Sequence, residues 1–120
     1  MHSPRDYQDC ASRLKALADP ERLKIVSKLL RGEKSVSTLA AELNLPIDNV
    51  SHHLRVLRAA QLVQTQKQGK FVIYSLAEDV VAGNLNSAAN KKIDLGCCQL
   101  DLVQVSLPAN RSRRARAKGS

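Results

Sequence analysis

Apolar residues recur every three or four positions through the first half of the chain and then alternate with polar residues. This change of period predicts helices followed by a β-hairpin. The periodic segments predict four helices, at residues 4–17, 20–31, 37–43 and 46–58. Ser3 and Asp19 can cap the first two, each with a proline in the first helical position. Asn44, which tolerates a positive φ, and Pro46 predict a tight turn before the fourth helix. The third and fourth helices therefore predict a helix-turn-helix.

Weaker elements follow in the second half. Residues 62–74 alternate on either side of a turn at Gly69, where a positive φ is needed, and predict a hairpin. A fifth helix is expected over residues 77–90, although the glycine in its middle would cost about 1 kcal/mol. Residues 93–107 fit a short strand with a break in phase better than a helix. Disorder is expected after residue 107.

The expected fold is mainly α with a small β-hairpin wing, which is a winged helix-turn-helix with a helical dimer interface. A chain of 120 residues has room for one domain. That domain covers residues 1–107 and includes a cysteine-containing segment, 93–107, while residues 108–120 form a disordered basic tail. A small helical core often completes itself by dimerising. Two apolar stripes are expected to meet a partner, one of Tyr7, Leu14 and Leu17 and one of Val80, Val81 and Leu85.

The fourth helix carries polar side chains on the face opposite its expected core residues, Val50, Leu54 and Leu57. A helix fits the major groove of DNA, and short polar side chains on its first turns can reach base edges. Basic residues further along the helix and at the hairpin tip suit phosphates, which set affinity and register more than sequence choice. The predicted DNA-binding residues are Asn49, Ser51, His52, Arg55, Arg58, Lys67 and Lys70.

Two neighbouring residues have other interpretations. Asp48 would repel phosphate, and is expected to complement the N-terminus of its helix. His53 falls on the side of Val50 and Leu54, which favours a buried, hydrogen-bonded histidine over a base reader. The helix pair and hairpin could also be a scaffold without a DNA role. Pattern, wing and basicity together favour DNA binding.

The net formal charge is +8, and residues 1–107 contribute only +3 of it. A tail with this basic character suits a polyanion such as DNA, or serves only to keep the chain soluble. No stretch approaches the roughly 20 apolar residues that span a bilayer, and the N-terminus lacks the apolar segment of a signal peptide. A cytoplasmic protein without a membrane partner is therefore expected. The basic residues of the tail are Arg111, Arg113, Arg114, Arg116 and Lys118.

Three separated stretches resemble the ArsR/SmtB-type winged-helix repressors. They are Leu14 to Leu23 (LKALADPERL), Val50 to Leu57 (VSHHLRVL) and Lys67 to Tyr74 (KQGKFVIY). The resemblance, over roughly residues 10–85, implies a homodimer joined through the first and last helices. It also implies repression of an operator on double-stranded DNA, released by an inducer that is often a metal or metalloid ion. Pro46 stands where the family usually has a hydroxyl residue, so that side-chain cap is missing. Ile47 also replaces a commonly polar residue.

Three cysteines are the remaining candidates for binding an inducer. The resemblance implies one metal site on the third helix, which has no cysteine here, and another on the last helix, which has no histidine here. Cys10, Cys97 and Cys98 remain. Thiolates favour soft ions, and three sulfurs suit As(III) in a trigonal pyramid. The third sulfur could come from Cys10 of the partner subunit at the dimer interface.

Other roles for these cysteines stay open. Cys10 lies among apolar residues, where a cysteine often behaves as a small buried hydrophobe. Oxidants or reactive sulfur could instead be sensed if Cys97 or Cys98 pairs with Cys10. In the expected compartment, thiols or metal ligands are commoner than structural disulfides.

An enzyme is not expected, because the sequence has no phosphate-cradling loop, no CxxC motif and no nucleophile with an ordered base. A small thiol protein or metal chaperone is a remote alternative that leaves the wing unexplained. The sequence therefore predicts a DNA-binding repressor without an obligatory cofactor, with a soft ion such as As(III) as its expected inducer.

Overall fold

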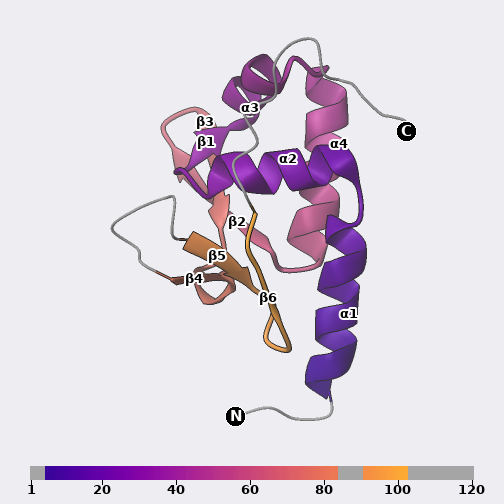
Figure 1. Cartoon of the computed structure of the whole chain (residues 1–120). Coiled ribbons are helices and arrows are strands. Elements are labelled where there is room, and N and C mark those ends of the chain that lie inside the picture. The colour runs from indigo at the N-terminus through magenta and orange to yellow at the C-terminus, as the bar shows by residue number, and fades with distance from the viewer. Residues whose placement is uncertain (1–4, 84–90, 103–120) are drawn as a thin grey trace, which may run out of the picture.

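Four helices form the first half of the chain in the predicted order (Figure 1). The computed structural model describes residues 5–83 and 91–102. Its helices are α1 (Arg5–Leu17), α2 (Pro20–Leu29), α3 (Val36–Leu43) and α4 (Ile47–Ala59). The four predicted helices are confirmed, with ends that differ from the prediction by one or two residues.

Local side-chain chemistry sets the helix boundaries. Asp19 accepts hydrogen bonds from two backbone N–H groups in the first turn of α2, at 2.8 and 3.1 Å. Ser35 accepts one from the first turn of α3, at 3.2 Å. Both bonds satisfy donors that a helix N-terminus leaves without a partner. Asn44 ends α3 with φ 55°, and α4 begins after Pro46 without a side-chain cap, as the sequence predicted.

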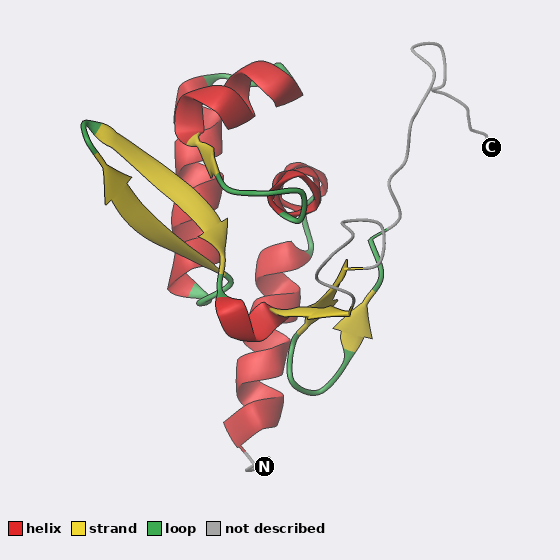
Figure 2. Ribbon diagram, turned by 90° about the vertical axis from the view of Figure 1, so that its left-hand side faces the viewer, coloured by secondary structure: helices red, strands yellow, loops and turns green. Residues whose placement is uncertain are grey.

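The wing is a three-stranded antiparallel sheet. Strands β2 (Val63–Gln68) and β3 (Phe71–Leu76) form the predicted hairpin, closed by a two-residue loop in which Gly69 has φ 62°. The sequence did not predict β1 (Lys34–Ser35), which pairs with the other edge of β3 and gives the order β1-β3-β2. Two residues are too few to show a strand period. Figure 2 shows the hairpin projecting from one side of the helices.

The predicted fifth helix over residues 77–90 is wrong for the part that the structure describes. Its place is taken by a 3-10 turn, η1 (Glu78–Val80), and by strand β4 (Val81–Gly83), while residues 84–90 lie outside the described ranges. Gly83 has φ 92°, which no right-handed helix accommodates. Val81 pairs with Ile93 across a sheet, and this long-range pairing overrides the weak local periodicity.

A second three-stranded sheet follows, in the order β4-β5-β6. Strands β5 (Lys91–Asp94) and β6 (Gln99–Leu100) are antiparallel neighbours. The expected strand within residues 93–107 is confirmed at Leu100, whereas residues 103–107 and the predicted tail lie outside the described ranges. The Lys91 ammonium donates to the backbone oxygen of Leu30 at 3.3 Å and so attaches this sheet to the end of α2.

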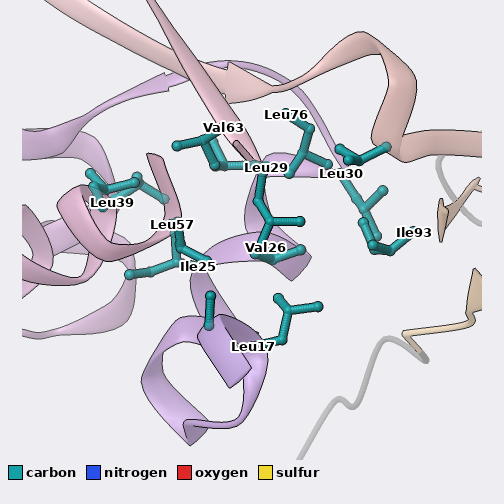
Figure 3. Packing of buried hydrophobic residues seen from close by; sticks show 14 of the residues in the cluster. Leu17, Ile25, Val26, Leu29, Leu30, Leu39, Leu57, Val63, Leu76 and Ile93 are labelled. Carbon is teal, nitrogen blue, oxygen red and sulfur yellow. The ribbon is translucent and has the colours of Figure 1, made fainter. Parts of the chain in front are cut away.

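One apolar core joins the helices to both sheets (Figure 3). Leu54 and Leu57 of α4 are 0% exposed, as the sequence predicted, and they belong to the same cluster as Val63 and Leu76 of the wing. Ile93 adds the small sheet to that cluster. Because buried side chains fix one face of α4, its opposite face has a defined position relative to the wing.

The apolar stripe expected on α1 is divided between core and surface. Leu17 is buried in the core, whereas Tyr7 is 74% exposed and Leu14 is 40% exposed. In the second expected stripe, Val80 is the buried last residue of η1, and Leu85 lies outside the described residues. Of the two expected stripes, the α1 surface is therefore the one that stays exposed among the described residues.

Candidate nucleic-acid interface and thiol site

The polar face of α4 is presented to solvent. Asn49 and His52 are exposed in the first two turns, and Ser51 beside them is half-buried. Arg55 and Arg58 are exposed further along the same helix. This arrangement puts short polar groups at the N-terminal end and cations toward the C-terminal end, the order expected of a helix that reads bases and holds phosphates.

The two predicted wing residues are exposed at the tip of the hairpin, Lys67 near the end of β2 and Lys70 in the two-residue loop. The Gln68 side-chain amide donates to the carboxylate of Glu33 at 3.3 Å, which links the hairpin to the segment before β1. The sequence did not indicate this contact, because the two residues are 35 positions apart. It restrains the wing tip that carries the lysines.

His53 is hydrogen-bonded, as the sequence predicted, but it is half-buried and not fully buried. Its Nε2 lies 2.8 Å from a carboxylate oxygen of Glu21, and its Nδ1 lies 3.2 Å from the Arg22 guanidinium. A neutral ring protonated on Nε2 would donate to Glu21 and accept from Arg22, satisfying both contacts. Arg22 also donates to the backbone oxygen of Ala16. The network ties α4 to α2 and to the end of α1.

The same network brings Asp19, Glu21 and His53 close enough to share a metal ion, since one ligand atom from each lies within 4.8 Å of the others. The chemistry of the group opposes a cation, because the Arg22 guanidinium is already beside the imidazole. Asp19 is committed to the helix start. Hydrogen bonds from the backbone N–H groups of Arg22 and Glu21 favour its charged form and hold the pKa of the carboxyl below its ordinary value. These residues position the helices.

The three cysteines converge between α1 and the turn that joins β5 to β6. Cys10 faces inward from α1 and is 1% exposed, Cys98 is half-buried, and Cys97 is exposed. Their sulfur atoms lie within 4.8 Å of one another. The turn is held by a 2.9 Å hydrogen bond from the N–H of Leu95 to the backbone oxygen of Cys98. Gly96 within it has φ 96°, a conformation that a β-carbon would strain.

The sequence-based expectation of free thiols is wrong for two of the three residues. Cys10 and Cys97 form a disulfide across 87 positions of sequence, with their Cα atoms 6.0 Å apart. Cys98 is free, and its sulfur lies 4.0 Å from that of Cys10. The Cys10 involved belongs to the same chain, whereas the sequence suggested one from a partner subunit. Packing of the small sheet against α1 brings Cys10 and Cys97 together, which no sequence spacing could indicate.

Arg13 connects α1, the helix that carries Cys10, to the end of α4, and sequence reasoning missed it. It lies one turn after Cys10 on α1, and its Nε donates to the backbone oxygen of Ala60 at the end of α4, at 3.3 Å. A second nitrogen of the guanidinium lies 3.5 Å from the carboxylate of Asp79 in η1. No spacing pattern marks this residue, since its partners are 47 and 66 positions away.

Among the described residues, no helix has the length and apolar character needed to cross a bilayer. Residues 19–65, which include the whole helix-turn-helix, match the family described as "Bacterial regulatory protein, arsR family".

Known proteins support the same relationship. The chain is 45% identical over 74 residues to "Transcriptional repressor SmtB homolog" of Synechocystis, an alignment that covers 62% of the chain and 56% of that relative. It is 42% identical over 89 residues to "HTH-type transcriptional regulator NmtR" of Mycobacterium tuberculosis, covering 72% of the chain and 74% of that protein.

A solved structure extends the similarity to the fold. The homodimeric winged helix-turn-helix DNA-binding domain Mb0332 of Mycobacterium bovis, described as a possible ArsR-family transcriptional regulator, superposes with a TM-score of 0.59 at 28% identity. The match covers 65% of this chain and 75% of that one. With the helix order, the wing and the exposed face of α4, these similarities establish that the chain belongs to the ArsR family of winged helix-turn-helix regulatory proteins.

Proposed function

We propose that this protein is a homodimeric transcriptional repressor that binds operator DNA with α4 and the wing, and that chemistry at its cysteines releases it. The observation that carries the proposal is the two-sided character of α4. Its apolar face is buried in the core, while Asn49, His52 and Arg55 are exposed on the other side. Relatives with similar sequences are named as transcriptional regulators. A DNA-binding regulator accounts for the wing lysines, which an enzyme or a metal chaperone would leave without a role.

The recognition helix is expected to supply specificity. Replacing Ser51 or His52 with alanine should weaken operator binding by about 1–3 kcal/mol, because each change removes a candidate base contact. Lys67→Ala is the matched control, since it removes a phosphate contact and should weaken binding to all DNA sequences alike. It should also lower the slope of the logarithm of the binding constant against the logarithm of the salt concentration by about one unit. The measurement is a salt titration of binding to the adjacent intergenic DNA and to random DNA. An equal loss on both DNAs for the helix variants would refute the proposed role of α4.

A dimer is supported by the exposed α1 surface and by the homodimeric Mycobacterium bovis relative. The protein should have the mass of a dimer in light scattering at micromolar concentration. Leu14→Lys, which places a charge in the exposed stripe beside Tyr7, should shift it toward the monomer because burying that charge is costly. The matched control is Lys15→Glu, an exposed position outside the stripe, which should stay dimeric. A monomeric wild-type protein would contradict the proposal.

The proposed inducer site is the cysteine cluster. Two thiolates that share one zinc ion at tetrahedral angles lie about 3.8 Å apart, given zinc–sulfur bonds of about 2.3 Å. The sulfurs of Cys10 and Cys98 are 4.0 Å apart, so the cluster fits a soft ion once the disulfide is reduced. Cys10, Cys97 and Cys98 would then hold an ion such as As(III), which supplies a soft acceptor for three thiolates.

The disulfide favours a second candidate inducer. Because Cys10 and Cys97 are bonded to one another, an oxidant that forms this bond would change the same site. The oxidised pair has no free thiolate to offer a metal, so ion binding and disulfide formation exclude one another. The site would therefore respond either to a soft ion or to an oxidant.

Two contacts provide a route from this site to the DNA. Arg13 joins α1 to the end of α4, and Arg22 joins the end of α1 to His53 in the middle of α4. A ligand shifts an equilibrium only by its differential affinity for the two states. A change at Cys10 that displaces α1 would act on both contacts and move α4 against its half-site.

Replacing both Cys97 and Cys98 with serine should keep operator binding and abolish release. In the wild type, the inducer should weaken binding by about 5–150-fold, the usual size of an allosteric coupling. In the double variant this factor should fall to about one. Cys10→Ser should be partly defective in release by the inducer. The measurement is operator binding titrated with arsenite under reducing conditions and with peroxide without reductant. Metal stoichiometry distinguishes the two inducers, and release of the double variant would exclude a thiol switch.

A further inference from the structure

The three cysteine residues differ sharply in their exposure to solvent. Cys10 is buried under α1, whereas Cys97, its disulfide partner, is exposed. A thiol or disulfide from solution can therefore approach the sulfur of Cys97 and not that of Cys10. Cys98 is half-buried and packs against the apolar core, with its sulfur 4.0 Å from that of Cys10.

At this distance, the Cys98 sulfur can act as a nucleophile toward the disulfide within the same chain. Disulfides exchange when a thiolate attacks one of the two sulfurs and the other leaves. If Cys98 loses its proton to water and attacks Cys10, a Cys10–Cys98 bond forms, the Cys10–Cys97 bond breaks, and Cys97 leaves as a thiolate. The number of disulfides is unchanged, so this step needs no oxidant. Consecutive Cα atoms are only about 3.8 Å apart, which makes the exchange a small rearrangement of the turn that contains Gly96.

We propose that Cys97 is a modification site for low-molecular-weight disulfides and that Cys98 makes it available by taking over the bond to Cys10. The released Cys97 thiolate attacks a small disulfide RSSR, which forms a Cys97–S–S–R bond and expels RS⁻. The buried sulfur of Cys10 stays protected by Cys98 throughout. This inference rests on the proposed thiol switch for its regulatory meaning. It adds a third class of compound that could act on the switch, the disulfides of small thiols, besides a soft ion or a peroxide.

The test uses the full-length oxidised protein and oxidised glutathione, with non-reducing mass spectrometry and fragmentation of the linked peptides. The wild type should gain one glutathione adduct, located on Cys97, together with a Cys10–Cys98 disulfide. Cys98→Ser should gain none, because its remaining cysteines stay bonded to each other. Cys97→Ser, reduced and reoxidised, should form the Cys10–Cys98 bond and also gain none.

Three results would overturn the proposal: an adduct on Cys98 with the Cys10–Cys97 bond intact, an adduct on Cys98→Ser, or two free thiols in reoxidised Cys97→Ser. Each is measured without DNA. A failure of the proposed repressor function would appear only in the operator titrations, so the two failures are distinguishable.

Discussion

Reducing the Cys10–Cys97 disulfide should lower the free energy of unfolding by about 2–4 kcal/mol, because the bond closes a long loop and restricts the unfolded chain. The two residues are 87 positions apart, and the bond fastens α1 to the turn between β5 and β6. In the folded state the small sheet is also attached through buried Ile93 and Leu95 and through the hydrogen bond from Lys91 to Leu30. The measurement is urea unfolding with and without a phosphine reductant.

The matched control for this measurement is Cys10→Ala, which cannot form the bond and should unfold at the same urea concentration in both conditions. Cys98→Ser keeps the bond and should respond to the reductant as the wild type does. Identical midpoints for the oxidised and reduced wild type would contradict the expected stabilisation.

Truncating Leu54 to alanine should lower the free energy of unfolding by about 2–5 kcal/mol, because it leaves a cavity beneath the recognition helix. Leu54 is 0% exposed and packs in the cluster that joins α4 to the other helices and the wing. Arg55→Ala is the matched control, since it changes the adjacent, exposed residue of the same helix. Its stability should stay within about 0.5 kcal/mol of the wild type.

Leu54→Ala and Arg55→Ala together distinguish a loss of stability from a loss of DNA binding. Arg55→Ala should fold normally and lose operator affinity, whereas Leu54→Ala at low temperature should bind DNA in proportion to its folded fraction. Urea unfolding and operator titrations of both variants make the comparison. If Arg55→Ala cost as much stability as Leu54→Ala, then α4 would not be held as the structure indicates.

The helix-turn-helix and the hairpin could be predicted from the chain because their signals are local. Asp19 caps a helix within three residues of its own position, Asn44 adopts a positive φ, and Gly69 closes a two-residue loop. The buried face of α4 follows from a spacing of three and four residues between Val50, Leu54 and Leu57. Each of these features depends on neighbours within about one helical turn or one hairpin.

The segment after the wing could not be predicted in this way. Its apolar residues Val80 and Val81 suit one turn of a helix as well as a strand, and the choice depends on Ile93, which lies 12 positions further along and pairs with Val81. The two-residue strand at Lys34 likewise exists only because β3 offers it an edge. Such pairings are long-range contacts, so local periodicity says nothing about them.

The amino-acid sequence by itself determined the four helices, the hairpin and the polar face of α4, and it singled out three cysteines as candidate reactive groups. Only the tertiary structure decided that Cys10 bonds to Cys97, with Cys98 free beside them, and that Arg13 and Arg22 join α1 to the recognition helix. The reason is physical. Helix caps and apolar periods are set by residues a few positions apart, whereas the thiol site and its links to α4 join residues 31 to 88 positions apart that meet only when the core closes.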